Sequence, residues 1–419
     1  MIKIDRRRLP RLTRAVVTLL VAGSASRAGA YPTGVATTFF PNPATGCNGC
    51  HSGGTAPTVT LTGPSVLAPG MGAVYTLQIE NPPSQPSGGL NVSSPDGTLA
   101  TGGGDSANTQ TIVGTGSRAE ITHSSPKASV SGVTTFTFQW TAPGSYSSTV
   151  LTGWGNAVNN NLSNSGDLAS STCLAVFPAP FTEDHFKLYK AATAKGAPKF
   201  VSPPNVTLTD QFESGKITVV GKPSLLGNPV DKDGGGIIDS TIHLECYKAK
   251  DAKDQPKFAG HRVEVTNQFC SQTLDMKKLS DLCVPSLTNP TVPPSNVLPA
   301  NVVDHFKCYK VKAPKGFAAF VPRTVTLTDD FESAKQMTVS KPDRVCNPVD
   351  KNGEGINDAT LHLVCYKIKD VTGQLKFVAT TVFTGNQFGA VQTGPEQLKA
   401  SKASLLCVPS LKTDLGPIP

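Results

Sequence analysis

The sequence predicts an all-β protein, with an N-terminal β-sandwich followed by two pseudo-twofold β-domains that are stapled by disulfides. Short runs of alternating apolar and polar residues lie between clusters of Gly, Pro, Ser and Asn, and long helical periods are missing. The C-terminal part repeats itself, since "EDHFKLYK" at 183–190 returns as "VDHFKCYK" at 303–310. Six of the ten cysteines fall at equivalent positions of this repeat.

Residues 1–30 have the features of a secretory signal peptide. Basic residues are followed by an apolar run from Ala15 to Gly23 and by small residues before a cut at Tyr31. We therefore expect an exported protein, in the periplasm, outside the cell or at its surface. The apolar run is too short to cross a membrane and no second long one follows, so we expect no transmembrane segment in the mature chain.

The signal segment also accounts for most of the net charge. The chain has 38 Lys+Arg and 30 Asp+Glu, and seven of these basic residues and one acid lie before Tyr31. The mature chain therefore has 31 basic against 29 acidic residues. Nothing in this balance indicates nucleic-acid binding, which needs a concentrated basic face.

Residues 31–177 are expected to form the sandwich. The segments "YTLQI" (75–79) and "TTFTFQW" (134–140) place apolar side chains at every second position. This period is typical of half-buried strands. Several such strands separated by Gly-, Ser- and Asn-rich loops favour a β-sandwich.

Two repeats follow, at 178–287 and 302–412, with a proline-rich linker at 288–301 between them and a tail at 413–419. Each repeat is itself doubled. The pattern His-(Phe/Leu)-x-x-Tyr-Lys begins four times, at His185, His243, His305 and His362. This nested duplication predicts that each repeat is a pseudo-twofold β-domain built from two similar halves.

The cysteines of an exported chain can form disulfides. The second, third and fourth quarters each have one Cys three residues after the His and one before the closing proline, whereas the first quarter lacks both. We therefore expect one disulfide per quarter, namely Cys246–Cys283, Cys308–Cys346 and Cys365–Cys407. Cys173 and Cys270 are left over, and they either pair with each other or remain free or intermolecular thiols.

The stretch "GCNGCHSGG" (46–54) contains the candidate cofactor site. Cys47, Cys50 and His51 have the spacing of a c-type haem site, in which two thiols attach the porphyrin and the following His ligates the iron. We therefore expect haem c, held by Cys47 and Cys50, with His51 as the ligand of the haem iron. The alternative is a Cys47–Cys50 disulfide or a reducible pair, with an incidental His51.

A haem iron can take a second axial ligand. In the first block His123 is the candidate for this role, and Met71 is a weaker one. A zinc site made of His123 and the three residues of the motif is a further alternative. It ranks below haem because the usual second paired cluster is missing.

Other motifs give weaker indications of a functional site. The acidic Gly-rich loops 231–239 and 350–358 look like calcium loops but have no Glu at the required last position, so we favour plain turns. We attribute the recurrent His residues to structural repetition, since each would lie on the outward face of an equivalent strand. We find no nucleophile elbow, zinc-protease motif or P-loop, and we expect no enzymatic activity.

The order of short motifs in the first block resembles the bacterial choice-of-anchor V domain, which is similar to reeler-type extracellular sandwiches. The motifs are "CNGCHSGG", "GGLNV", "EITH", "FTFQWTAP" and "GNAVNNNLSNSGD". The resemblance implies a secreted or surface-displayed domain with a CxxCH near its start, and no known reaction. In the repeats, "DHFKCYK", "CNPVDKNG" and "LCVPS" resemble an uncharacterised exported bacterial domain without an assigned function.

These features together predict a non-enzymatic extracytoplasmic or cell-surface protein whose N-terminal domain carries a covalent haem for electron transfer. Its partner would be an extracytoplasmic protein or redox partner. The alternative is a haem-free surface adhesion or structural protein with Cys47 and Cys50 in a disulfide. The two hypotheses differ in one observable, because a haem protein absorbs in the Soret band.

Overall fold

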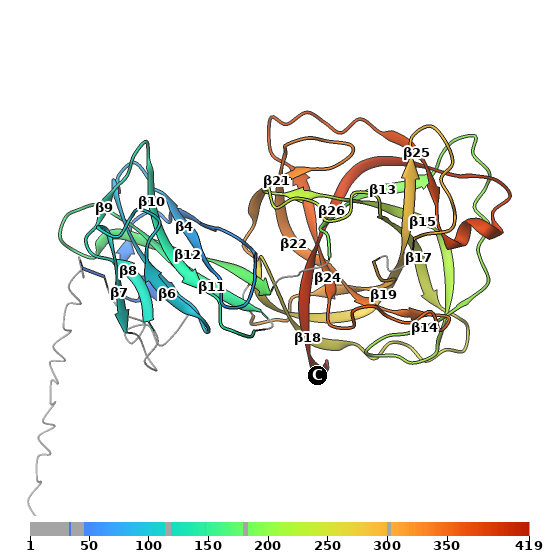
Figure 1. The fold of residues 1–419 in the computed structure, drawn as a ribbon, viewed down its shortest axis with the longest axis horizontal. Coiled ribbons are helices and arrows are strands. Elements are labelled where there is room, and N and C mark those ends of the chain that lie inside the picture. The colour runs from blue at the N-terminus through green and yellow to red at the C-terminus, as the bar shows by residue number, and fades with distance from the viewer. Residues whose placement is uncertain are drawn as a thin grey trace, which may run out of the picture.

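The computed structural model describes residues 33–34, 46–113, 119–146, 148–178, 183–299, 303–317 and 319–418. Within these ranges the regular structure is β-strand apart from two short 3-10 helices, and no helix is long and apolar enough to span a membrane. The chain is therefore all-β, as the sequence predicts. A sandwich and a barrel lie side by side (Figure 1). The predicted signal peptide lies outside the described residues.

The sandwich consists of two sheets. The smaller has the order β2-β4-β10-β6, and the larger follows β1-β12-β11-β5-β8-β7, with β3 beside β12 and β9 beside β5. The smaller sheet comprises β2 (Thr58–Thr62), β4 (Gly72–Glu80), β6 (Thr98–Thr101) and β10 (Val133–Thr141). The larger comprises β1 (Ser52–Gly53), β3 (Val66–Leu67), β5 (Ser87–Ser93), β7 (Thr109–Val113), β8 (Ala119–His123), β9 (Lys127–Ala128), β11 (Thr149–Val158) and β12 (Ser165–Pro178).

The sandwich core follows the predicted alternation. Phe136, Phe138 and Trp140 on β10 are fully buried, and Phe136 and Phe138 pair with Leu77 and Tyr75 on β4. All five belong to one apolar cluster with residues of the larger sheet. Residues at every second position therefore fill the space between the sheets, as in other β-sandwiches.

The repeats form a closed barrel of eight antiparallel strands. Each strand pairs with the next one in the circuit, and the last pairs with the first. In order these strands are β13 (Phe186–Thr193), β15 (Lys216–Pro229), β17 (His243–Asp251), β19 (Cys270–Asn289), β20 (Phe306–Lys312), β22 (Lys335–Pro348), β24 (His362–Asp370) and β26 (Glu396–Pro417). Closure leaves no free edge among the main strands.

Shorter elements cover the outside of this circuit. They are β14 (Val206–Thr209), β16 (Asp231–Lys232), β18 (His261–Asn267), β21 (Arg323–Thr328), β23 (Asp350–Lys351), β25 (Thr380–Gly385) and the 3-10 helix η4 (Gln387–Val391). Four of their pairings join one repeat to the other, namely β14 with β23, β16 with β21, β18 with β26 and β25 with β19.

The two repeats share this one barrel, whereas the sequence predicts a separate domain for each. β13 of the first repeat pairs with β26 of the second, and β19 pairs with β20 across the boundary. One apolar cluster contains residues of both, such as Val230 and Val325. The physical reason is that each repeat supplies four strands, and such a half-barrel has two open edges that the other repeat covers.

Two connecting segments also differ from expectation. In the predicted linker, Ser295 and Asn296 pack closely against Gly385 and Gly389, so this stretch lies on the second repeat. In the predicted tail, residues up to Pro417 continue β26 and pair with β18. Both segments find backbone or packing partners that the sequence alone does not reveal.

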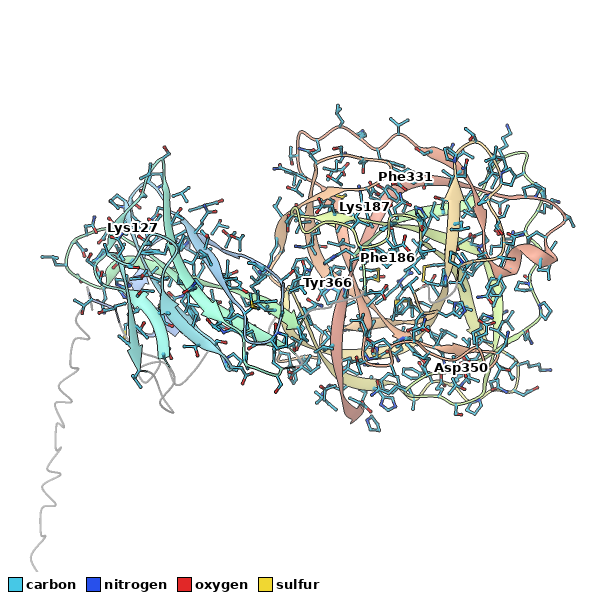
Figure 2. All side chains as sticks on the ribbon, viewed as in Figure 1. Lys127, Phe186, Lys187, Phe331, Asp350 and Tyr366 are labelled. Carbon is cyan, nitrogen blue, oxygen red and sulfur yellow. A yellow bond between two sulfur atoms is a disulfide. The ribbon has the colours of Figure 1, made fainter. Side chains whose placement is uncertain are left out.

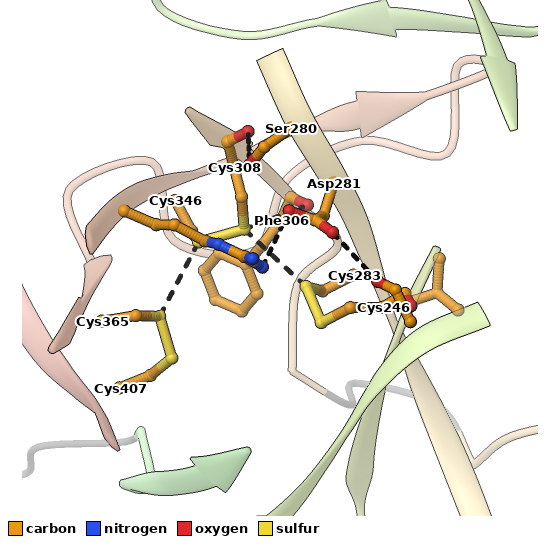
Figure 3. The surroundings of a disulfide bond; sticks show 12 residues. Cys246, Ser280, Asp281, Cys283, Phe306, Cys308, Cys346, Cys365 and Cys407 are labelled. Carbon is orange, nitrogen blue, oxygen red and sulfur yellow. Dashed lines mark hydrogen bonds and ion pairs between the residues drawn. A yellow bond between two sulfur atoms is a disulfide. The ribbon is translucent and has the colours of Figure 1, made fainter. Parts of the chain in front are cut away.

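The barrel interior holds the three predicted disulfides. Cys246–Cys283, Cys308–Cys346 and Cys365–Cys407 each join residues that are directly opposite on neighbouring strands. Their sulfurs belong to an apolar cluster that draws on all eight circuit strands and on no other strand (Figure 3). Loops of this length imply about 4 kcal/mol of stabilisation per disulfide, through restriction of the unfolded chain.

The outer face of the barrel carries buried charges. Lys187 on β13 is fully buried, and its Nζ donates to Glu332 Oε2 at 2.8 Å and lies 3.4 Å from Asp329 Oδ1. The Tyr189 hydroxyl donates to Asp329 Oδ2 at 2.8 Å. Phe331 of the same loop packs on the Tyr189 ring, 5.2 Å away between centroids. Figure 2 labels Lys187 and Phe331 on the barrel. A strand of the first repeat is therefore capped by a loop of the second.

The reverse contact exists as well. Lys307 on β20 is fully buried, with its Nζ 2.8 Å from Glu213 Oε2 and 3.8 Å from Asp210 Oδ1. The Tyr309 hydroxyl donates to Asp210 Oδ2 at 2.8 Å. The repeats thus exchange their "TDQFES" and "TDDFES" loops, each of which neutralises the lysine of the other repeat.

A fourth disulfide, Cys173–Cys270, joins the sandwich to the barrel. The sequence leaves open whether these two cysteines pair with each other. Arg323 lies beside it, with Nη1 3.3 Å from the carbonyl oxygen of Cys173 and Nη2 3.3 Å from the sulfur of Cys270. Four disulfides in one chain accord with an oxidising compartment and hence with export.

Candidate functional site

The CxxCH motif folds into one tight turn. The 3-10 helix η2 (Gly46–Gly49) contains the first cysteine, and β1 begins directly after His51. The backbone N–H groups of Cys50 and His51 both donate to the carbonyl oxygen of Cys47, at 3.1 Å each. This turn keeps both thiols and the imidazole within one compact loop.

The loop is fastened to β12, next to the edge of the larger sheet. The Asn48 side chain makes two hydrogen bonds to the backbone of Ala169, at 2.8 and 2.9 Å. Asn164 Nδ2 donates to the carbonyl oxygen of Cys50 at 2.6 Å. β1 then runs parallel to β12, with Ser52 opposite Ser165. The side chains of the motif therefore start from a fixed backbone.

Both motif cysteines are free thiols in the structure. Cys47 is 9% exposed and Cys50 is half-buried. Burial, together with the nearby Cys50, raises the pKa of the Cys47 thiol to about 12. Cys47 is thus protonated at neutral pH and is a poor nucleophile until it becomes accessible.

A carboxylate orients His51. Its Nδ1 lies 3.2 Å from Asp167 Oδ2, and the Asp167 side chain is only 3% exposed. The other carboxylate oxygen, Oδ1, accepts from the backbone N–H of Asn159 at 2.8 Å, which fixes the group in place. Among the described residues His51 Nε2 has no hydrogen-bond partner. The imidazole thus has one nitrogen anchored and one available as a ligand.

The structure does not bring His123 to this loop. His123 ends β8, and the path from β12 to β8 crosses β11 and β5, which corresponds to about 14 Å. Its Nδ1 lies 3.1 Å from both the N and the O of Leu90. His123 is therefore not positioned as a second axial ligand beside His51. Met71 is 56% exposed and precedes β4 of the other sheet.

The zinc alternative would also need His123 at the loop. No group of three or more His, Cys, Asp or Glu that could hold a metal ion is found in the described part of the chain. In the first calcium-like loop Asp231 Oδ1 accepts from Gly236 N, and Asp239 Oδ1 accepts from Thr241 N. These carboxylates cap turns, as the Gly-rich turn interpretation expects.

The recurrent histidines stand at the start of equivalent strands or directly before them. Short strands and loops cover the outward face on which the sequence predicts them. Burial lowers the pKa of His185 to about 3, of His243 to about 4 and of His362 to about 2. They are neutral at physiological pH. His305 is half-buried, and its Nε2 lies 2.8 Å from Glu354.

The donor set of the motif fits a covalent haem in its chemistry. Two thiols stand three residues apart, and the adjacent imidazole has its Nδ1 held by a carboxylate while Nε2 is left for a metal, as is usual for metal-binding histidines. Burial of Cys47 is the feature that must change, because its sulfur has to turn outward to reach a porphyrin. Sequence reasoning missed Asp167, one of only five acids between residues 46 and 178.

Comparison with known proteins gives information on the repeats only. Residues 243–409 match a family described as a repeat of unknown function (DUF7450). The match spans the second to fourth quarters of the barrel, which confirms an uncharacterised repeat domain in the C-terminal part of the chain. No curated protein matches the chain. The resemblance of the first block to the choice-of-anchor V domain stays a prediction.

Proposed function

We propose that this protein is an exported haem carrier whose N-terminal sandwich holds haem c at the CxxCH loop. Cys47 and Cys50 would attach the group and His51 would ligate its iron. The observation that supports this proposal best is the contact from His51 Nδ1 to the buried Asp167. A carboxylate in this position fixes the tautomer and orientation of a metal-binding imidazole.

The bound group would supply electron transfer, and the protein would supply orientation. Asp167 would keep the proton of His51 on Nδ1, which leaves the lone pair of Nε2 for the iron. Asn48 and Asn164 hold the backbone of the loop. Because His123 lies elsewhere in the sheet, no side chain of the described residues is assigned to the sixth coordination position of the iron.

The test is the intact mass and visible spectrum of the protein exported from a host that matures c-type cytochromes. We expect the added mass of haem and a Soret band, both lost in Cys47→Ser/Cys50→Ser. Asp167→Asn should retain the covalent haem but shift the reduced spectrum or the potential, because the imidazole becomes less basic.

A matched control is Asp414→Asn. Asp414 Oδ1 lies 3.1 Å from His261 Nδ1, a similar His–Asp contact with no cysteine beside it in the sequence. This variant should leave mass and spectrum unchanged. A colourless protein from the maturing host would overturn the proposal.

The second candidate is a haem-free structural or adhesion protein. The burial of Cys47 and the paired hydrogen bonds of Asn48 favour it, because both make the loop a tight cap beside the edge of the larger sheet. In that case Cys47→Ser/Cys50→Ser should lower the melting temperature of the sandwich, and the exported parent protein should show no Soret absorption.

A further inference from the structure

A cavity of about 960 Å³ opens at one end of the barrel, remote in sequence from the CxxCH loop. Seven of the eight circuit strands contribute to its lining. The lining contains the lysine that closes each of the four His-x-x-x-Tyr-Lys patterns, namely Lys190, Lys248, Lys310 and Lys367.

Strand alternation explains why these lysines meet. On β20, Phe306 and Cys308 face the barrel interior, so Lys310 takes the next inward position at the mouth. The other three quarters have the same spacing. Leu225 and Leu405 line the cavity and belong to the interior cluster that contains the disulfides of Figure 3. The site therefore has an apolar, cross-linked floor and a cationic rim.

Two carboxylates offset part of the positive charge on one side of the rim. Asp343 and Asp281 are the acids, and Asp281 is fully buried. The ion pairs join Lys310 and Lys367 to Asp343 at 2.7 and 3.5 Å, and Arg344 and Lys248 to Asp281 at 2.7 and 3.6 Å. In this half of the mouth two carboxylates thus stand against four cations, so about half of the positive charge is compensated.

The other side of the rim has no such acids. Lys190 on β13 and Lys402 on β26 are directly opposite each other and both line the cavity. Lys195 and Lys399 line it nearby. Within the described residues none of these four lysines has an ion-pair partner. Like charges directly opposite in a sheet destabilise it, so these lysines form a cationic pair that a bound anion would relieve.

Two differences between the repeats create this asymmetry. Asp281 precedes "LCVPSL" in the first repeat, and Leu405 takes the same position in the second. Asp343 stands four residues before "NPVDK" in the second repeat, and Ser224 takes that position in the first. The pseudo-twofold axis therefore relates a partly neutralised half-site to one whose lysines have no ion-pair partner among the described residues.

We propose that this cavity binds a compact anion that bears two or more phosphate or sulfate groups. Several separated cations around a cavity of this size match several negative groups better than one. The apolar floor formed by Leu225 and Leu405 limits solvation beneath the anion and strengthens its contacts with the lysines. Phosphate and sulfate present the same oxyanion chemistry, and the choice of probe distinguishes them.

The experiment is calorimetric titration of the secreted full chain with inorganic tripolyphosphate and with sucrose octasulfate. We expect saturable binding that weakens with added salt. Lys190→Gln/Lys402→Gln should weaken it by about tenfold or more, as expected for lost charge-assisted hydrogen bonds. The control Lys253→Gln/Lys376→Gln removes the same charge from exposed loop positions outside the cavity and should change the affinity by less than about twofold.

The two probes distinguish a phosphate ligand from a sulfated one. Binding of tripolyphosphate alone supports a phosphate ligand, and binding of sucrose octasulfate alone supports a sulfated sugar. The melting temperature of Lys190→Gln/Lys402→Gln without ligand should equal or exceed that of the parent, because repulsion is removed. Failure of both probes to bind, or equal weakening in both double variants, would overturn the proposal.

Discussion

At the scale of single residues, Glu183 is a buried carboxyl close to three other acids, shortly before β13. It is buried, and within the described residues its Oε1 has no hydrogen-bond partner. Burial raises the pKa of Glu183 well above its usual range, and Asp184, Asp304 and Asp358 raise it further. The equivalent position of the second repeat holds Val303.

Glu183→Gln should therefore stabilise the protein at alkaline pH. A folded-state pKa above the unfolded value means that the contribution of Glu183 is full below about pH 4.5 and is lost as the pH rises through the folded pKa. At pH 8 we expect the variant to gain about 1–3 kcal/mol in the free energy of unfolding, with little difference at pH 4. Guanidinium unfolding of both proteins at pH 4 and pH 8 measures this difference in stability.

The exposed Glu264 on β18 provides the control, since Glu264→Gln should leave stability unchanged at both pH values. An equal gain for Glu183→Gln at pH 4 and pH 8 would show that ionisation is not the cause.

Sequence proximity decides how much of the candidate site can be predicted. Cys47, Cys50 and His51 are adjacent in the chain, so their chemistry follows from spacing alone. Asp167 is 116 residues from His51 and reaches it only because β1 pairs with β12. His123 is the reverse case. The sequence predicts it as a second axial ligand, but β8 lies three strands away from β12 in the same sheet, so His123 is far from the loop.

At the scale of elements, the period-two pattern predicts the strands and the direction of their side chains. Phe306 and Cys308 face inward while Lys307 and Tyr309 face outward, as the alternation requires. The pattern could not predict the exchange of the "TDQFES" and "TDDFES" loops. Both repeats contain the same lysine and the same acids, so contacts within a repeat and between repeats look identical in the sequence.

Lys187→Met should test the energy of this exchange. The substitution leaves Asp329 buried without its cation, and loss of one partner from a buried ion pair costs about 3–5 kcal/mol. We expect a loss of this size in guanidinium unfolding. Lys187→Met/Asp329→Asn should recover part of it, because the uncompensated charge is removed. The exposed Lys199 provides a control, since Lys199→Met should be neutral. A loss below about 1 kcal/mol for Lys187→Met would show that water reaches the pair.

At the scale of the whole molecule, the duplication is visible in the sequence but its closure into one barrel is not. The period near 120 residues fits two independent domains equally well. The pairing of β13 with β26 and of β19 with β20 distinguishes one shared barrel from two independent domains. Strands that pair across the repeats carry no sequence pattern that names their partner. The proline-rich segment between the repeats misleads for the same reason, since it reads as a spacer but packs on Gly385.

A single repeat, residues 178–287, should therefore not fold as a monomer. Its β13 and β19 would be open edges, and its buried Lys187 would lack the acids of the partner loop. Two copies can restore both features, because the first repeat contains its own Lys187, Asp210 and Glu213. Light scattering with circular dichroism should thus find either an unfolded chain or a dimer that rebuilds the barrel, as in domain swapping. Residues 178–418 should give a folded monomer, and a folded monomer of 178–287 would contradict the shared-barrel architecture.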